Sequence, residues 1–330
     1  MIITKTPFRI SFVGGGSDLP DFYREHPGAV LSTTINKYMY ISSHQFFEND
    51  KIRMKYSKTE TVGNVEEITH PIFKEVLKQF DIQGGVELSS IADVPAGTGM
   101  GSSSSFTVGL LHNLYAIKGK HVSKEVLAQE ACDIEINRLK EPIGKQDQYA
   151  AAYGGLNIFR FNSDETVGVE KLYLKNEISA SLNENLIMFY TGSQRKANEI
   201  LTEQKSNTKA ADKKATLIEM TQLVDELKNT LITENLSDFG KLLHHNWLLK
   251  KQLASKISNG TINDAYDLAL KNGALGGKLL GAGGGGFLLF YCEKENQPQL
   301  IEAMMPLRKI DFNLEHEGSK VIYFGDETTF

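Results

Sequence analysis

Residues 95–105 read PAGTGMGSSSS, a run of glycines and serines between two segments of clear periodicity. The preceding residues 86–91, VELSSI, are typical of a β-strand, and residues 106–117 carry apolar side chains at helical spacing. Glycines let the backbone approach an anion closely, and the free N–H groups at the start of a helix attract one. A flexible loop would have the same composition, but the strand before it and the apolar helix after it favour a phosphate-binding loop.

The spacing of the glycines argues against the common nucleotide-binding motifs. GTGMG at 97–101 is not GxGxxG, because its third glycine comes one residue early. The sequence contains no GxxxxGK[ST], since Gly277-Lys278 is followed by a leucine. Residues 238–240 spell DFG, as in protein kinases, but no HRDxxxxN precedes them. We interpret these three residues as the start of a helix.

The composition is typical of a soluble globular protein. The 330 residues are 41% hydrophobic and 23% charged, and the formal net charge is -5. An acidic balance argues against nucleic acid or an anionic membrane as a partner, because both attract basic surfaces. Cys132 and Cys292 form no metal-binding or disulfide pattern, and the first residues contain no signal-peptide core. We therefore expect a cytoplasmic protein.

Periodicity divides the chain into two halves. In the first half, residues 2–13 alternate as a strand that ends at three glycines, and helices are expected over 124–139 and 146–152. In the second half the helices become more polar. We expect a strand at 181–192, helices at about 195–232, 236–254, 261–272 and 298–309, and strands from 287 and at 321–324. This change of composition places the domains at 1–180 and 181–330.

Three motifs, in order along nearly the whole chain, resemble those of the GHMP kinases, a family that includes galactokinase and mevalonate kinase. Residues 95–104 are similar to the central phosphate loop of the family, with Met100 in place of the usual leucine. Residues 7–18, PFRISFVGGGSD, resemble the first motif, and 278–287, KLLGAGGGGF, the third. The resemblance implies a two-domain α+β fold, with an N-terminal phosphate-loop domain and a C-terminal ferredoxin-like domain. It also implies ATP and Mg²⁺ as cofactors.

The resemblance also implies roles for single residues. Asp147 would accept the proton of the acceptor hydroxyl, and Arg9 would stabilise the charge that develops. Ser103 and Glu135 would bind magnesium, with Glu130 as the alternative carboxylate. The ATP phosphates would lie against Pro95, Gly97, Thr98, Gly99, Met100, Gly101, Ser102, Ser103 and Ser104. The acceptor would contact Gly15, Gly16, Ser17, Asp18, Gly283, Gly284 and Arg195. Without the resemblance, Asp147 would be interpreted as a helix cap and the glutamates as solvated helix charges.

The form of the motifs also bears on the acceptor. GGGSDLPDF at 14–22, together with KQDQYAAAYGG at 145–155 and GGKLLGAGGGGF at 276–287, is similar to the bacterial D-glycero-D-manno-heptose 7-phosphate kinases. This similarity implies ATP-dependent phosphorylation of the anomeric hydroxyl, for nucleotide-activated heptose and surface glycan synthesis. Fucose kinases share the GGGSD signature, so a free sugar is the alternative acceptor. A non-catalytic sensor of ATP and sugar is the alternative from another class of protein.

A phosphorylated acceptor needs cationic side chains near its phosphate. The sequence offers four candidates that it does not rank, namely Arg138, Lys145, Arg195 and Lys196. Small molecules, ATP and a phosphorylated sugar, are therefore the expected partners. The sequence does not indicate the oligomeric state.

Overall fold

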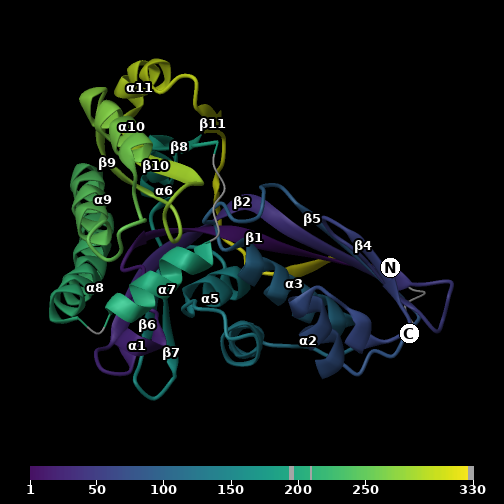
Figure 1. Ribbon diagram of the computed structural model, residues 1–330. Coiled ribbons are helices and arrows are strands. Elements are labelled where there is room, and N and C mark those ends of the chain that lie inside the picture. Colours follow the sequence, from purple (N-terminus) through teal and green to yellow (C-terminus); the bar gives the residue numbers. More distant parts are fainter. Residues whose placement is uncertain (193–196, 209, 326–330) are drawn as a thin grey trace.

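The computed structural model describes residues 1–192, 197–208 and 210–325, which form two β-sheets covered by helices (Figure 1). The strands of the first sheet are β1 (Ile2–Val13), β2 (Gly28–Gln45), β3 (Ile52–Lys55), β4 (Thr59–Val62), β5 (Val86–Ala92), β6 (Asn157–Phe161), β7 (Val167–Lys171), β12 (Leu314–Glu315) and β13 (Lys320–Phe324). Their main order is β13-β1-β2-β5-β3-β4, with β6 and β12 also paired to β2, and β7 paired to β6. The long strand β2 thus organises this sheet.

Helices of the first half cover the sheet. They are α1 (Pro20–Tyr23), α2 (Pro71–Gln79), α3 (Ser102–Ile117), α4 (Lys124–Cys132), a π-helical turn (Asp133–Arg138) and α5 (Gln146–Tyr153). Helix α3 lies against β1 and β2, and its apolar side chains are buried with theirs. Its cap residue is Gly101, whose φ of 73° is a left-handed conformation that favours glycine.

The second sheet confirms the expected ferredoxin-like arrangement. It contains β8 (Leu186–Tyr190), β9 (Ala274–Leu279), β10 (Phe287–Cys292) and β11 (Arg308–Ile310), all antiparallel, in the order β11-β8-β10-β9. The helices of this half are α6 (Asn176–Asn185), α7 (Ala197–Asn207), α8 (Ala211–Ile232), α9 (Leu236–Lys250), α10 (Gly260–Lys271) and α11 (Gln297–Ala303). From β8 to β11 the elements therefore follow a βαββαβ order, with several helices in the first crossover.

The last two strands of the chain join the first sheet. Strands β12 and β13, which we placed in the domain 181–330, pair with β2 and β1 of the first sheet. The pairing of β13 covers the edge of β1, where Ile2 and Thr4 are fully buried. The division at residue 180 stays a prediction, but the segment 314–324 belongs to the first sheet.

Two predicted elements have the wrong bounds. The strand expected at 181–192 begins at Leu186, because the residues before it form α6. The helix expected at 298–309 ends at Ala303, and Arg308–Ile310 forms β11 instead.

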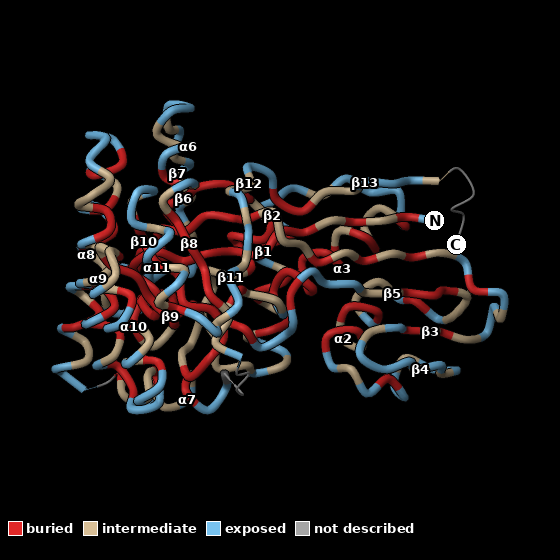
Figure 2. Tube along the Cα trace, turned by 90° about the horizontal axis from the view of Figure 1, so that it is seen from above, coloured by how far each residue is buried: buried red, intermediate tan, exposed pale blue. Residues whose placement is uncertain are grey.

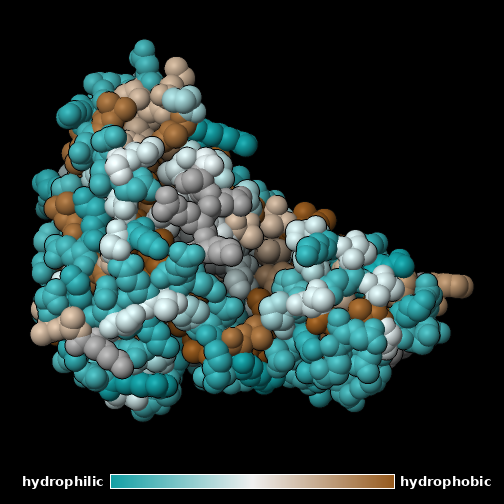
Figure 3. Space-filling model, viewed as in Figure 1, coloured by the Kyte–Doolittle hydropathy of each residue, from teal (hydrophilic) through white to brown (hydrophobic). Residues whose placement is uncertain are grey.

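Buried residues lie along β1, β2 and the second sheet (Figure 2), whereas the face in Figure 3 is mostly hydrophilic. Within the described ranges, no helix combines the length and the apolarity needed to cross a bilayer.

Backbone contact between two glycine-rich loops connects the halves. A Cβ on Gly99 would lie 2.3 Å from the carbonyl oxygen of Leu280, and one on Gly281 would lie 2.4 Å from the Cα of Gly99. On the same interface, a Cβ on Gly286 would lie 2.3 Å from the carbonyl oxygen of Thr98. The loops therefore pack closer than any side chain would permit, which explains the glycines of both motifs.

This contact predicts unequal costs for two Gly→Ala substitutions. Gly99 and Gly119 both have positive φ, of 85° and 62°, but only Gly99 has backbone in the space that a Cβ would fill. We expect Gly119→Ala to lower the free energy of unfolding by about 1 kcal/mol, and Gly99→Ala by about 3 kcal/mol or more. Urea denaturation measures both values. Equal losses would show that the loops separate without cost.

Candidate active site

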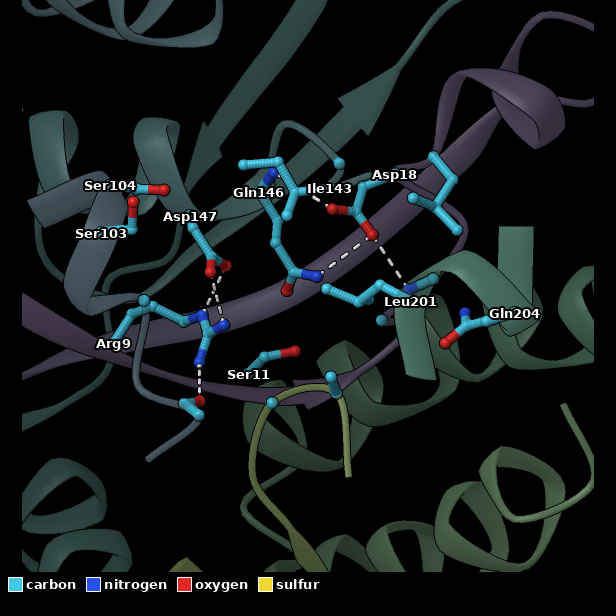
Figure 4. Close-up of a pocket in the computed structure, with 18 of the residues that line it drawn as sticks. Arg9, Ser11, Asp18, Ser103, Ser104, Ile143, Gln146, Asp147, Leu201 and Gln204 are labelled. Carbon is cyan, nitrogen blue, oxygen red and sulfur yellow. Dashed lines mark hydrogen bonds and ion pairs between the residues drawn. The ribbon is translucent and has the colours of Figure 1, made fainter. Parts of the chain in front are cut away.

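A cavity of about 460 Å³ lies where the three glycine-rich motifs meet (Figure 4). The first motif contributes the end of β1 and the turn after it, and the second contributes the loop before α3. The third motif contributes the end of β9 and the loop that follows. Side chains of α5, α7 and α9 complete the wall. The sequence motifs, far apart in the chain, therefore enclose one space.

An ion pair between Arg9 and Asp147 forms one wall of the cavity. Arg9 Nε and Nη2 donate to the two carboxylate oxygens of Asp147, each at 2.7 Å, and Nη1 donates to the carbonyl oxygen of Gly99 at 2.5 Å. A Cβ on Gly101 would lie 3.2 Å from Asp147 Oδ2, so the carboxylate lies directly against the phosphate loop. Bidentate pairing fixes both the position and the orientation of Asp147. Arg9 and Asp147, to which the resemblance assigns separate roles, are therefore in direct contact.

Ser103 and Glu135 also come together, at the start of α3. Ser103 Oγ donates to Glu135 Oε1 at 2.5 Å, and Gln148 Nε2 donates to Oε2 at 2.7 Å. Burial raises the pKa of the fully buried Glu135 carboxyl to about 7, although both hydrogen bonds lower it. Within the described ranges, no lysine or arginine forms an ion pair with this carboxylate. A buried carboxylate beside a hydroxyl offers the oxygen ligands that Mg²⁺ prefers, so these residues fit the metal.

The alternative carboxylate, Glu130, faces away from the cavity. It accepts hydrogen bonds from Tyr115 Oη at 2.6 Å and Gln79 Nε2 at 2.9 Å, between α2, α3 and α4. In the parts of the chain that the structure describes, no group of three or more His, Cys, Asp or Glu residues could hold a metal by itself. A magnesium site here would therefore need ligands from water and nucleotide phosphates in addition to the protein.

Asp18 is held on the opposite side of the cavity from the phosphate loop. Its Oδ1 accepts from the Gly16 N–H at 2.9 Å and from Gln146 Nε2 at 3.1 Å, and its Oδ2 accepts from the Gln146 N–H at 3.3 Å. A Cβ on Gly144 would lie 2.0 Å from this carboxylate. Burial, followed by the charge of Asp147, raises the pKa of Asp18.

The other expected contact residues divide into two groups. Those that line the cavity are Gly15, Gly16, Gly97, Gly99, Gly101, Ser102, Ser103 and Ser104. Those that do not line the cavity are Ser17, Pro95, Thr98, Met100, Gly283 and Gly284. For example, Ser17 Oγ donates to backbone carbonyls, and the Gly284 N–H donates to Ile257. In the third motif, Gly281 and Ala282 line the cavity instead of the two expected glycines.

Two of the four expected partners of a substrate phosphate, Arg138 and Lys145, do not line the cavity. Arg138 donates to Asp133 at 2.7 Å, and Lys145 donates to Glu165 at 2.6 Å, and neither lines the wall. Arg195 and Lys196 lie outside the described residues. The sequence gives no rank to these four, and the structure pairs two of them with carboxylates elsewhere.

Two buried lysines in the wall were missed. Lys278 Nζ donates to the backbone carbonyls of Ser11 and Phe12 at 2.6 and 3.0 Å, and burial lowers its pKa far below the usual value. Lys250 Nζ donates to Gly15 O at 3.3 Å and Gln204 Oε1 at 3.2 Å, and burial lowers its pKa to about 8. Lys278 could have been found from its position inside the third motif. Lys250 could not, because it lies in a helix without any motif.

Family models match both halves of the chain. The GHMP kinases N terminal domain matches residues 67–155, and the GHMP kinases C terminal domain matches residues 223–308. A D-glycero-alpha-D-manno-heptose 7-phosphate kinase of Campylobacter jejuni is 30% identical over 97% of this chain and 98% of the relative. The chain is a GHMP kinase.

Solved structures extend the likeness of this GHMP kinase to the fold. A D-glycero-D-manno-heptose 1-phosphate kinase from Bacteroides thetaiotaomicron has a TM-score of 0.81 at 21% identity, covering 99% of this chain and 100% of its own. A putative sugar kinase from Campylobacter jejuni has a TM-score of 0.77 at 28% identity, covering 97% of both chains. GHMP kinases use ATP, generally with Mg²⁺.

The positions of the two glutamates predict different magnesium dependence. We expect Glu135→Gln to raise the Mg²⁺ concentration for half-maximal activity by roughly tenfold to a hundredfold, because it removes an anionic ligand. Glu130→Gln is the matched control and leaves that concentration unchanged. Magnesium titration at saturating ATP measures both. An identical magnesium response of Glu135→Gln and the unmodified kinase would remove Glu135 from the metal site.

Proposed function

We propose that this GHMP kinase transfers the γ-phosphoryl group of ATP to the anomeric hydroxyl of D-glycero-D-manno-heptose 7-phosphate. The product would be the 1,7-bisphosphate, which serves nucleotide-activated heptose and surface glycan synthesis. One observation carries the kinase chemistry, namely that Arg9 holds both oxygens of Asp147 against the phosphate loop. The similarity to the Campylobacter heptose 7-phosphate kinase over nearly both full lengths supports the acceptor.

The phosphate loop would bind the ATP phosphates. Gly97, Gly99 and Gly101 line the cavity without side chains, and α3 begins immediately afterwards at Ser102. Free N–H groups at the start of this 16-residue helix favour anionic oxygens. The donor phosphates would therefore lie between the loop and Asp147, which sets the direction of transfer.

Asp147 would accept the proton of the acceptor hydroxyl as the phosphorus–oxygen bond forms. Its carboxylate is 23% exposed, enough to contact a substrate, whereas the Arg9 side chain is 6% exposed. The guanidinium compensates the carboxylate charge in the ground state and faces the negative charge that develops during transfer. General base catalysis of this kind contributes about 10²–10⁴-fold to a rate.

Ser103 and Glu135 would hold the magnesium ion that accompanies ATP. When bound, the ion neutralises phosphate charge during transfer. The protein contributes a hydroxyl and a carboxylate already in contact, with Gln148 orienting the second carboxylate oxygen. An uncompensated negative charge on the fully buried Glu135 is costly. The magnesium ion would compensate that charge.

The acceptor would occupy the part of the cavity bounded by the Gly15-Gly16 turn and Asp18. Arg195 stays a candidate for its phosphate, together with Lys196.

A plant bifunctional fucokinase/GDP-fucose pyrophosphorylase from Arabidopsis thaliana is 26% identical over 88% of this chain, and the match spans 30% of that protein. A free sugar is therefore the second candidate acceptor. The presence of both Asp147 and Ser103 at the cavity argues against a non-catalytic sensor. We also propose a cytoplasmic location, where ATP is available as the donor.

A substrate panel tests the proposed acceptor. ATP consumption with Mg²⁺ is measured on heptose 7-phosphate, heptose 1-phosphate, fucose, galactose and mevalonate, and phosphorus NMR identifies each product. We expect a new anomeric phosphate on heptose 7-phosphate and little turnover of the others. Phosphorylation of free fucose would replace the acceptor but keep the catalytic residues. Transfer to mevalonate alone would contradict a sugar kinase.

A further inference from the structure

Three unpaired polar atoms face the cavity beside the Gly15-Gly16 turn. Ser11 Oγ, Gln146 Oε1 and Gln204 Nε2 are buried and have no hydrogen-bond partner within the described residues. Ser11 is 5% exposed and Gln204 is 1% exposed, and all three residues line the cavity (Figure 4). Buried polar groups without partners are rare because they are costly. Three of them around one turn indicate a ligand that supplies the missing partners.

Charged neighbours fix which atom of each amide is free. Gln204 Oε1 accepts from Lys250 Nζ at 3.2 Å, and an ammonium group can only donate, so the free atom of Gln204 is the NH₂ donor. Gln146 Nε2 donates to Asp18 Oδ1 at 3.1 Å, an oxygen that also accepts from the Gly16 N–H. The free atom of Gln146 is therefore the carbonyl acceptor.

The two glycines keep the space between these side chains open. A Cβ on Gly15 would lie 3.4 Å from Ser11 Oγ and 3.7 Å from Gln146 Nε2. A Cβ on Gly16 would lie 2.3 Å from Gln204 Nε2. Ser11 and Gln146 thus border the space beside Gly15, and Gln204 borders the space beside Gly16, within one cavity. A methyl group on either glycine would occupy part of that space.

We propose that Ser11, Gln146 and Gln204 form a subsite that recognises ring hydroxyls of the sugar acceptor, an inference that rests on the proposed function. The subsite offers a donor, an acceptor and a hydroxyl that does both, and a sugar hydroxyl is the ligand group that donates and accepts at once. A phosphate would only accept, and would meet the Gln146 carbonyl oxygen unfavourably. The phosphate of the acceptor therefore lies outside this subsite.

Lys250 and Asp18 are positioning residues in this arrangement. Each orients one glutamine amide, and neither has to touch the sugar for its effect. Burial of Lys250 is compatible with this positioning role, since its ammonium group donates to two carbonyl oxygens within the protein. The charges of Lys250 and Asp18 thus determine which glutamine offers a donor and which offers an acceptor to the sugar.

Gln204→Glu tests the subsite with little change of shape. The new carboxylate keeps the contact with Lys250 but replaces the free donor by an acceptor. Calorimetry without ATP measures binding of D-glycero-D-manno-heptose 7-phosphate and its 2-, 3- and 4-deoxy derivatives. We expect the unmodified kinase to bind at least one deoxy derivative roughly tenfold to a hundredfold more weakly than the parent. Gln204→Glu should bind the parent as weakly as that derivative and no longer distinguish the two.

Matched controls separate recognition from general damage. Gln252→Glu makes the same change of charge at an exposed position and should retain parent affinity. ATP affinity should be unchanged in both variants. The inference is overturned if Gln204→Glu binds the parent sugar with unmodified affinity, or if it weakens parent and deoxy derivatives by equal factors.

Gly15→Ala gives an independent test, because Gly15 is not among the residues with positive φ and tolerates a side chain on backbone grounds. We expect its methyl group to weaken sugar binding at least tenfold, while Gly63→Ala, which has open space around it, has no effect.

If the unmodified kinase phosphorylates fucose or galactose instead of the heptose, the proposed acceptor fails, and the same variants are measured on that sugar. Unchanged binding of that sugar by both Gln204→Glu and Gly15→Ala would overturn the subsite by itself.

Discussion

The ion pair between Arg9 and Asp147 is the interaction on which the rest of the site depends. It joins three segments, since Arg9 lies on β1, Asp147 lies in the first turn of α5, and the same guanidinium donates to Gly99 in the phosphate loop. Removing two charges from water is costly unless geometry and further hydrogen bonds compensate. Here both oxygens of Asp147 are paired and a third donor of Arg9 is used. The pair therefore fixes the Asp147 carboxylate relative to the phosphate loop.

Close backbone packing gives this pair a rigid frame. The phosphate loop touches the loop after β9 through Gly99, Gly281 and Gly286, at distances that exclude any side chain. This contact joins the loop after β9 of the second sheet to the loop before α3, and the cavity lies between the motifs that make it. Lys278 strengthens the same boundary, because its ammonium group binds the carbonyls of Ser11 and Phe12 across the two halves. Glycine content in both motifs is thus a requirement of assembly as well as of phosphate binding.

Motifs in the sequence predicted the parts of the site whose chemistry depends on local residue patterns. The resemblance implied roles for Arg9, Asp147, Ser103 and Glu135, and the structure brings Arg9 into contact with Asp147 and Ser103 into contact with Glu135. The sequence named Glu135 first and Glu130 as the alternative, and in the structure a π-helical turn carries Glu135 to Ser103 while Glu130 binds Tyr115 and Gln79. Lys250 and Gln204 were missed because they lie in polar helices with no motif, and only tertiary packing brings them to the cavity.

The fold shows the same limit. Local periodicity predicted β1, β5, α3 and α5 well, but the return of β12 and β13 to the first sheet is a long-range pairing. No local pattern indicates which open strand edge such a segment will cover. Likewise, Ser17 and Thr98 belong to the motifs, yet their hydroxyls bind backbone carbonyls and stabilise the loops. Membership of a motif therefore does not distinguish a contact with ligand from support of the loop.

Asp147→Asn tests the central assignment most directly, since it keeps the shape of the side chain but removes its charge and its basicity. The measurement is kcat with the acceptor identified for the unmodified kinase, alongside the dissociation constant of ATP with Mg²⁺, which reports whether the loop is intact. The account predicts that kcat falls by about 10²–10⁴-fold while the ATP dissociation constant changes little. Full turnover in this variant, with ATP bound as before, would contradict the role of Asp147 as the base.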